Sequence, residues 1–454
     1  MHRAPAIHSR VIDRALQPLS RVRPGEGVLA ALLLVGCFLL LTSYYVLKTA
    51  REGLVLSKGA FGLRGDELKV YATGAMAVLL LGLVPAYGLL ANRVRRIVLI
   101  DVTVAIVLVC LAVFFVLGHA GLPIGLAFFI WLGLVSLLLI AQFWSYANDL
   151  YTEEQGKRLF AIIAIGGSLG AIGGPQLAKR ADSFTLMLLA GVILIVYAAL
   201  IHVVERRDAV RSPRPIRREP IAGSNGFALL ARERFLLLIA ALLVVINIVN
   251  TTGEYILSNV VREHAIASVP AAAHAELFGA AREAAIDADR RELIKAFYGD
   301  FFTWMNILAF LIQAFVVSRV IDKLGIRRSL LVLPLVVIGA YGAIGAAGAL
   351  FLIRAGKIME NGTNYSLQNT VHQTLFLRVP RVAKYKAKAA IDTFSVRAGD
   401  LCAAVIVAFA IHQLGFGRRA LALLNLVVIC ALWIPICIGI ARRHVQLGAE
   451  PPAA

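Results

Sequence analysis

The sequence predicts an all-α polytopic membrane protein with twelve transmembrane helices in two pseudo-symmetric six-helix halves. Of its 454 residues, 59% are hydrophobic and only 16% are charged, with a mean hydropathy of +0.80. Soluble globular domains lie far from this composition. Apolar runs close to the roughly 20 residues that cross a bilayer core recur along the chain. In addition, one sequence offset relates landmarks in the first half to landmarks in the second.

The predicted spans follow the apolar runs, and the residues between them define the domains. Two spans are unusual, because 159–178 is rich in glycine and 352–373 is polar. We expect an N-terminal half at 1–204, a cytoplasmic linker at 205–234, a C-terminal half at 235–440 and a tail at 441–454. The twelve spans are 28–47, 68–90, 97–117, 122–147, 159–178, 184–204, 235–257, 297–318, 329–351, 352–373, 388–412 and 419–440.

The largest insertion lies in the second half, at 258–296. It is rich in Ala, Glu and Arg, and Ala271–Ala288 is helical by composition. We expect it to form an extracytoplasmic helical hairpin or plug.

The placement of Lys and Arg predicts that both termini are cytoplasmic. With the N-terminus inside, 29 of the 46 basic residues fall on the cytoplasmic side and 14 on the opposite side. The first span is expected to be an uncleaved helix. We expect an integral membrane protein, located in a bacterial inner membrane. The net charge of +19 fits this asymmetry and contact with anionic lipid or substrate. Because the bases are dispersed over many loops, nucleic-acid binding is not expected.

A loop pattern occurs once in each half. Span 2 ends in YGLLANRVRR and span 8 in SRVIDKLGIRR, and both combine Asp or Asn, a base and a later basic pair. The pattern resembles the loop signature of the major facilitator superfamily, whose two halves are related by an axis along the membrane normal. An offset of 230 residues superposes the two loops and also places Arg158 on Lys388. We assign a gating role to Asn92, Arg93, Asp322, Lys323 and Arg327.

Both halves also carry motifs of one transporter family. QFWSYANDLYTEEQGKRLF and NYSLQNTVHQTLFLRVPRVAKYKAKAAIDTFSVRAGD resemble stretches of the ATP/ADP translocases, the nucleotide transporters of plastids and intracellular bacteria. INIVNTTGEYILSN is similar to the span 7 motif of that family, with its carboxylate at Glu254. One stretch departs from the family pattern, since Asn369–Gln373 stands where the family has Asp-Pro-Thr-Lys-Glu. The matching residues include Phe143, Trp144, Ala147, Asn148, Lys157, Arg158, Phe160, Tyr365, Ser366, Leu367, Lys386, Lys388, Asp392, Arg397 and Gly399.

Charged residues inside or beside the spans are the candidate substrate-binding groups. A nucleotide carries several negative charges, and Arg and Lys are the side chains that bind phosphate. Carboxylates such as Glu52, Glu254, Glu360 and Asp392 could pair with these cations in the empty protein. For each residue, a fixed structural ion pair or a side chain that reaches the membrane surface is the alternative. The candidates are Lys48, Arg51, Arg158, Glu254, Arg354, Lys357, Lys388, Asp392 and Arg397.

Other motifs point to packing rather than chemistry. The glycines of AIGGSLGAIGG follow no strand and lack the Gly-Lys-Ser/Thr ending of a phosphate loop, which favours close helix packing. The five cysteines form no CxxC pair and no zinc spacing. We expect no metal, no cofactor and no catalytic constellation, and therefore no enzyme.

These observations predict a secondary active transporter. The expected substrate is a small anionic, phosphate-bearing and nucleotide-like metabolite such as ATP or ADP, moved by alternating access among membrane lipids. A proton-coupled major facilitator symporter of another solute, with Glu254 or Asp392 as its proton site, is an alternative. A non-transporting membrane sensor or scaffold is a second alternative, and each oligomeric state fits the sequence equally.

Overall fold

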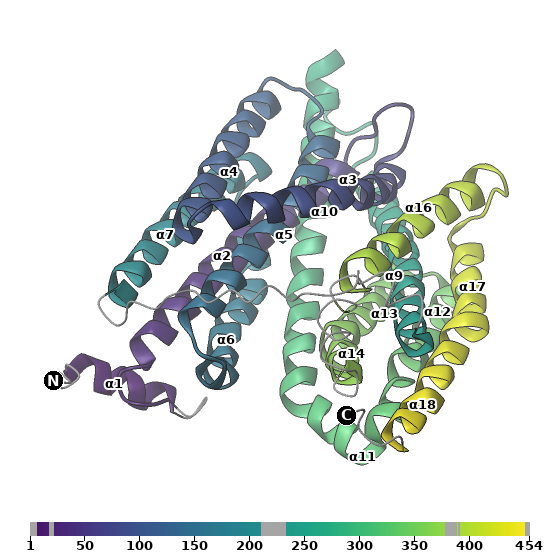
Figure 1. Cartoon of the computed structure of the whole chain (residues 1–454). Helices are drawn as coiled ribbons and strands as arrows, with labels where there is room; N and C mark the ends of the chain where they lie inside the picture. Colours follow the sequence, from purple (N-terminus) through teal and green to yellow (C-terminus); the bar gives the residue numbers. More distant parts are fainter. Residues whose placement is uncertain (1–6, 18–21, 210–232, 377–387, 389–390, 450–454) are drawn as a thin grey trace. The chain divides into compact units, whose positions relative to one another are not determined.

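The computed structural model describes residues 7–17, 22–209, 233–376, 388 and 391–449 (Figure 1). These residues are helical throughout, apart from short connections and one isolated β-bridge between Ala60 and Leu63. The predicted all-α fold class is confirmed. Seven helices precede the linker: α1 (Ile7–Leu16), α2 (Gly27–Leu56), α3 (Gly65–Arg93), α4 (Arg96–His119), α5 (Gly125–Leu150), α6 (Glu153–Ala178) and α7 (Ser183–Ala209).

The elements after the linker include four short π-helical segments. The α-helices are α9 (Arg234–Ser268), α10 (Gly279–Leu311), α11 (Val317–Ser329), α12 (Val332–Ala347), α13 (Leu350–Thr363), α14 (Asn369–Leu375), α16 (Val396–His412), α17 (Arg418–Val428) and α18 (Ile434–Ala449). The π segments are η1 (Ile312–Val316), η2 (Asn364–Gln368), η4 (Ile391–Ser395) and η5 (Ile429–Trp433). π-bulges inside helices are frequent at functional sites.

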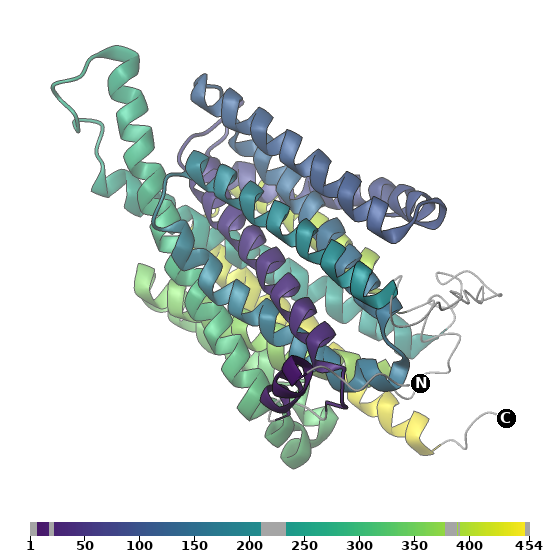
Figure 2. The same ribbon diagram turned by 90° about the vertical axis from the view of Figure 1, so that its left-hand side faces the viewer.

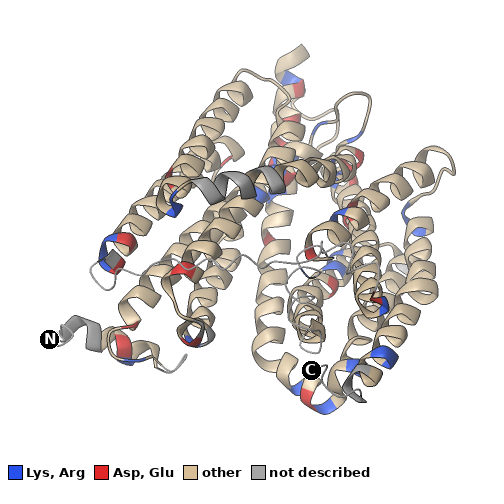
Figure 3. Cartoon of the chain, in the orientation of Figure 1, with Lys and Arg blue, Asp and Glu red and all other residues tan. Residues whose placement is uncertain are grey.

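Apolar helices long enough to cross a bilayer dominate the chain. Nine such helices occur among the described residues. The other predicted spans coincide with α3, with the shorter α12 and with the joined segments α13, η2 and α14. Figure 3 shows long stretches of helix without Lys, Arg, Asp or Glu, as lipid contact requires. The protein is therefore an integral membrane protein.

Packing divides the chain into two compact units. Unit 1 comprises Met1–Leu54, Leu83–Arg218 and Arg291–Thr303, and unit 2 comprises Val55–Gly82, Glu219–Arg290 and Trp304–Ala454. The first part of α3 therefore belongs to unit 2, and the middle of α10 belongs to unit 1. The predicted division at 1–204 and 235–440 stays an interpretation of the sequence.

Unit 1 has one continuous hydrophobic core, to which α2, α4, α5, α6 and α7 contribute. Figure 2 shows these helices running alongside one another. Glycines of α6 allow its backbone to approach α2 closely. A Cβ atom on Gly170 would lie 2.6 Å from the carbonyl oxygen of Phe38, and one on Gly174 would lie 2.9 Å from that of Thr42. The predicted packing role of this glycine-rich segment is confirmed.

In unit 2, α9 is the central helix and packs against α13, α16, α17 and α18. Its 35 residues span about 52 Å at about 1.5 Å per residue, which exceeds the roughly 30 Å bilayer core. The excess forms a hairpin with the start of α10. Ala271–Ala288 was predicted to be helical, but the helix begins only at Gly279. Residues 269–278 form an irregular connection, in which Arg290 donates hydrogen bonds to the carbonyl oxygen of Val269.

Candidate functional site

In unit 1, aromatic rings surround the ammonium group of Lys48. Its Nζ lies 4.4 Å from the ring centroid of Phe302, 5.1 Å from that of Tyr45 and 5.8 Å from that of Tyr44. Among the described residues, no carboxylate lies within ion-pair distance of this nitrogen. A cation held over aromatic faces gains about 0.5–2 kcal/mol. Its charge is therefore stabilised without being neutralised.

Arg51 follows one turn later on α2, and its surroundings differ from those of Lys48. Its Nη2 donates to Glu52 Oε1 at 2.8 Å, and both side chains are nearly buried. The guanidinium carbon also lies 4.1 Å from the ring centroid of Phe129. The predicted pairing of Arg51 with Glu52 is present, so this base is already neutralised within the unit.

Arg158, at the start of α6, holds a carboxylate just before α2. Its two Nη atoms donate to the two oxygens of Glu26 at 3.0 and 3.1 Å, which is the forked geometry of a strong ion pair. Gln155 donates to the same carboxylate at 3.2 Å. Burial of Glu26 acts to raise its pKa, but the hydrogen bonds from Arg158, the Arg23 backbone and Gln155 outweigh burial and lower that pKa. Arg158 therefore connects the start of α6 to the start of α2 through this ion pair.

Unit 2 contains a buried network centred on Glu254 of α9 and Lys357 of α13. The Nζ atom of Lys357 lies 3.0 Å from Glu360 Oε2 and 3.8 Å from Glu254 Oε1, and it donates to Asn250 Oδ1 at 3.0 Å. Lys357 and Glu360 are almost fully buried, whereas 23% of the Glu254 side chain is exposed. Asn361 donates to Glu254 Oε1 at 3.1 Å. Glu254 is therefore the accessible member of this network.

The sequence interpretation missed a second lysine of this network. Lys69, at the start of α3, lies 3.5 Å from Glu254 Oε2 and donates to Ser258 at 3.0 Å. One turn earlier, Asp66 is fully buried and accepts a hydrogen bond from Asn259 of α9 at 2.9 Å, which ties the start of α3 to α9. One sequence signal could have drawn attention to Lys69. Span 2 begins with two acidic residues, Asp66 and Glu67, directly before its apolar run.

The network leaves no room for a side chain at position 253. A Cβ atom on Gly253 would lie 3.0 Å from Lys357 Nζ and would also collide with the hydroxyl of Tyr341. That hydroxyl donates to the carbonyl oxygen of Val249 at 3.1 Å. Glycine is therefore the residue that lets α13 and α12 approach α9 at the level of the charges.

The remaining candidates of the second half form two separate clusters in unit 2. Lys388 donates to Asp392 Oδ2 at 2.8 Å, and His372 lies 2.8 Å from Asp392 Oδ1. Arg397 instead pairs with Asp400 at 3.0 Å. The structure thus joins Lys388 to Asp392, one of the carboxylates expected to pair with the cations, and pairs Arg397 with Asp400 instead.

Arg354 and the gating candidates lie apart from these clusters. Arg354 is half-buried on α13, one turn before Lys357. Asp322, Lys323 and Arg327 are exposed on α11, which Gly325 interrupts with a φ of 71°. Asn92 and Arg93 end α3, and their side chains lie outside the described residues. No described ion pair connects the gating candidates, so their role stays a prediction.

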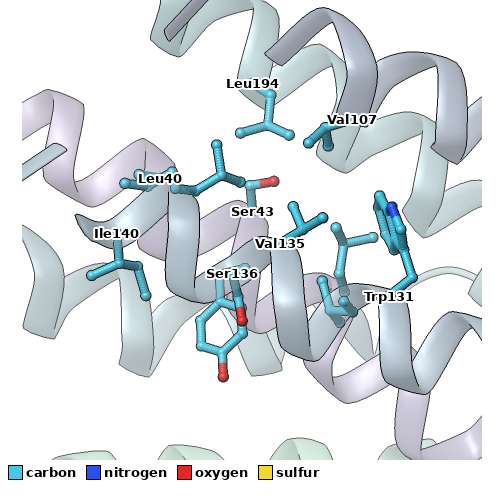
Figure 4. A pocket seen from close by; sticks show the side chains of 12 residues that line it. Leu40, Ser43, Val107, Trp131, Val135, Ser136, Ile140 and Leu194 are labelled. Atoms are coloured by element: carbon cyan, nitrogen blue, oxygen red, sulfur yellow. The ribbon is translucent and has the colours of Figure 1, made fainter. Parts of the chain in front are cut away.

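A pocket inside unit 1 does not fit an anionic ligand. Residues of α2, α4, α5 and α7 surround it, and apolar side chains such as Leu40, Trp131 and Leu194 dominate its lining (Figure 4). Its serine hydroxyls, of Ser43 and Ser136, already donate to backbone carbonyl oxygens. The described residues also contain no group of His, Cys, Asp and Glu side chains suited to a metal ion.

Known proteins resemble this chain at low sequence identity. No family model matches it. It is 21% identical over 321 residues to ADP,ATP carrier protein 1 of Chlamydia pneumoniae, with 60% of this chain and 57% of that protein covered. The protein of the same name from Chlamydia muridarum is 22% identical over 312 residues, with 58% and 54% covered. The chain thus spans little more than half the length of the curated relatives it matches.

Solved transporter structures superpose on nearly the whole chain. A POT family transporter has a TM-score of 0.62 at 14% identity, covering 90% of this chain and 96% of its own. A bacterial homologue of the iron transporter ferroportin has a TM-score of 0.60 at 14% identity, with 91% and 98% covered. A variant of the nucleoside transporter NupG has a TM-score of 0.55 at 13% identity, with 92% and 99% covered.

At such identities the solved structures establish the fold, and the curated relatives establish the resemblance. The curated relatives are ADP,ATP carrier proteins, the family that the motifs around Phe143–Trp144 and Lys388–Asp392 resemble. The predicted fold and resemblance are confirmed: this chain has the major facilitator fold and is similar to the ADP,ATP carrier proteins of chlamydiae.

Proposed function

We propose that this protein is a secondary active transporter that moves a small phosphate-bearing, nucleotide-like metabolite by alternating access. The names of its relatives support transport of ADP and ATP, and a structural neighbour is a nucleoside transporter. A transporter of this kind needs cations at membrane depth that can bind phosphate and later release it.

The observation that carries the proposal is the sharing of one accessible carboxylate by two lysines. Glu254 lies 3.5 Å from Lys69 and 3.8 Å from Lys357, distances longer than those of a well-formed charged hydrogen bond. Because part of Glu254 is exposed, an incoming phosphate group can take its place beside the lysines. The network then binds an anion by exchanging one negative partner for another.

Such an exchange limits the energetic cost of buried charge. Charged side chains at the centre of a bilayer cost at least about 2.5–3.5 kcal/mol each, and removing one partner of a buried pair costs about 3–5 kcal/mol. In the empty protein, Glu254 and Glu360 together balance the charges of Lys69 and Lys357. With substrate bound, phosphate oxygens do so, and neither state leaves a lysine unpaired.

Unit 1, taken by itself, contains a cation of a different kind. Lys48 is stabilised by Phe302, Tyr45 and Tyr44 rather than by a carboxylate, so its charge is available to a phosphate. Phe302 is buried, but Tyr44 and Tyr45 are only half-buried and are the rings on which a nucleobase could stack, an interaction of about 1–3 kcal/mol per base in nucleic-acid complexes. Lys48 therefore supports an anionic substrate that also carries an aromatic group.

The test is flux through purified protein in proteoliposomes. Vesicles preloaded with unlabelled ATP are given labelled ATP, ADP, inorganic phosphate or a sugar phosphate, and vesicles without protein serve as blanks. We expect uptake of at least one labelled phosphate compound, accelerated by internal counter-substrate if exchange operates. Absence of flux for every compound, in protein that is folded by thermal unfolding, would overturn the proposal.

Lys69→Gln tests the network within the same assay. Loss of one charged partner of a phosphate, worth about 1.5–3 kcal/mol, should raise the KM for the transported compound about 10- to 100-fold. Lys58→Gln is the matched control, because Lys58 is a surface lysine, 61% exposed, 3.7 Å from Asp287. Equal KM values for both variants would contradict a role of Lys69 in phosphate binding.

A further inference from the structure

A row of buried polar side chains extends along the span formed by α13, η2 and α14. This row begins in the Glu254 network and continues toward the end of α14. In a bilayer such groups need partners, since each unsatisfied polar group costs several kcal/mol. Its buried members are Lys357, Glu360, Asn361, Thr363, Ser366, Gln368 and His372.

His372 ends this row, in contact with two charged residues. Its Nε2 lies 2.8 Å from Asp392 Oδ1, and Lys388 Nζ lies 2.8 Å from Asp392 Oδ2. Only 7% of the His372 side chain is exposed, against 34% for Asp392 and 27% for Lys388. One end of the cluster is therefore buried, and the other is accessible.

The contact with Asp392 fixes the chemistry of the imidazole ring. A carboxylate accepts hydrogen bonds, so Nε2 carries the hydrogen in this pair and Nδ1 keeps a lone pair in the neutral ring. The Nδ1 atom is buried and has no hydrogen-bond partner among the described residues. The ring thus presents its basic nitrogen to the protein interior.

A second buried polar group lies one turn away on the same helix. Gln368 is 2% exposed, and neither its amide nitrogen nor its amide oxygen has a hydrogen-bond partner among the described residues. Residues four apart lie on the same helix face, so Gln368 and His372 are neighbours. Buried polar atoms of this kind usually bind water, which can carry a proton.

The other charged groups on neighbouring elements are engaged elsewhere or exposed. On α16, Arg397 and Asp400 pair with each other at 3.0 Å. The helix α11 packs against α14, but no described ion pair links its charged residues to His372. Those residues are Arg319, Asp322, Lys323, Arg327 and Arg328. Asp392 and Lys388 are thus the charged groups in the described residues that act on this imidazole.

We propose that His372 is a proton-binding site of this protein, with Asp392 and Lys388 as its partners, and that its protonation drives substrate uptake. A proton from water forms an N–H bond at Nδ1, and the ring becomes an imidazolium paired with Asp392. The same proton returns to water when this side chain faces the opposite compartment. The coupling part of this inference rests on the transport function proposed above, whereas the binding of the proton does not.

Protonation changes the charge of the cluster by one unit. When the ring is neutral, the charges of Asp392 and Lys388 cancel. When the ring is an imidazolium, the cluster carries a net positive charge. Positive charge in the protein favours binding of an anion, and by linkage the bound anion favours protonation. Histidine suits this task because its ordinary pKa of about 6.5 lies within the physiological range.

Proton binding is tested first, without substrate, by NMR of the protein labelled at histidine. His372→Gln identifies the His372 ring signals by their loss. We expect those signals to change on protonation of the ring, and the pH at which they change to differ in Asp392→Asn, which lacks the carboxylate partner. His202→Gln is the control, because His202 forms a half-exposed pair with Asp101 at 3.0 Å. A His372 signal that does not titrate, or that titrates identically in Asp392→Asn, would overturn the proton site.

Coupling is tested in proteoliposomes that contain a pH-sensitive dye. An imposed inward proton gradient should raise uptake of the transported phosphate compound several-fold in wild type and in His202→Gln, but not in His372→Gln. Gradient-insensitive uptake by wild type, or a full response of His372→Gln, would overturn coupling through His372. If wild type transports no phosphate compound, the proposed function fails, while the NMR titration still decides the proton site.

Discussion

Lys48 and Arg158 are both cations predicted to bind substrate, and their surroundings give them different roles. The two Nη atoms of Arg158 grip both oxygens of Glu26, so release of this arginine would leave a partly buried carboxylate without its main partner. Lys48 faces the rings of Phe302 and Tyr45, which stabilise its charge and leave the ammonium hydrogens available. At the residue scale, Lys48 is therefore the better candidate for a direct substrate contact.

Lys48→Gln should weaken substrate binding about 10- to 100-fold, since a hydrogen bond to a charged group contributes about 1.5–3 kcal/mol. The melting temperature should change little, because the lost cation–π contacts are weak. Isothermal titration with ATP and thermal unfolding measure the two quantities. Tyr45→Phe keeps the ring and serves as the control. Unchanged ATP affinity in Lys48→Gln would exclude Lys48 as a phosphate ligand.

An ion pair between charged side chains could be predicted only where its two residues are close in the sequence. Lys388 and Asp392 are four residues apart, a spacing at which side chains meet on a helix. Arg51 and Glu52 also pair, but adjacent residues do not face each other on a helix, so their spacing did not predict this contact. Lys69 is 185 residues from Glu254, and no local pattern connects them. The departure at Asn369–Gln373 drew attention to the stretch, but only the fold brings its histidine to Asp392.

At the scale of helices, glycine spacing controls the contact between α6 and α2. Gly170 and Gly174 lie four residues apart, on the same face of α6, and that face rests on backbone atoms of α2. Gly173, between them, has no heavy atom within 4 Å of an added Cβ. Adjacent glycines on one helix therefore have different roles, which depend on the face they occupy.

Gly170→Ala should destabilise the protein by about 1–3 kcal/mol, because the new methyl group collides with backbone atoms of α2 that cannot rotate away. Gly173→Ala is the matched control and should be neutral or slightly stabilising, since alanine favours helix and the site is open. Thermal unfolding in detergent compares the two variants. Equal stability would contradict close packing of α6 on α2.

The existence of the helices could be predicted from the apolar runs, but several of their ends could not. Hydropathy detects the part of a helix that contacts lipid, so it ended span 7 at residue 257. The helix α9 continues to Ser268, because it also carries the polar hairpin outside the hydrophobic stretch. Composition likewise predicted helix at Ala271–Ala288, whereas Pro270 and the left-handed conformation of His274 favour a turn before Gly279.

At the scale of the whole molecule, the chain order and the packing order differ. The first part of α3 packs in unit 2 and the middle of α10 packs in unit 1. A repeat offset in the sequence relates positions along the chain, but it contains no information on which distant segments pack together. The twelve-helix fold could therefore be predicted from the sequence. The packing of the first part of α3 in unit 2 and of the middle of α10 in unit 1 could not.

Topology is testable with reporters fused to the full-length chain. The excess of Lys and Arg on one side predicts that a fluorescent reporter after residue 449 folds in the cytoplasm. Alkaline phosphatase inserted at residue 274, in the connection between α9 and α10, should be active because that connection is predicted to be extracytoplasmic. An inactive phosphatase at residue 274, together with no fluorescence from the C-terminal reporter, would invert the predicted orientation.

The central claim is that substrate phosphate replaces Glu254 beside Lys69 and Lys357, and binding of ATP to Glu254→Gln tests it most directly. Removing the competing negative charge should lower the Kd about tenfold, equivalent to about 1.4 kcal/mol, in isothermal titration of the purified protein. Glu263→Gln is the control, because Glu263 lies on the same helix in an exposed pair with Arg418. Tighter binding by Glu254→Gln alone is the predicted result. Unchanged or weaker binding by Glu254→Gln, with wild type binding normally, would contradict the exchange of carboxylate for phosphate.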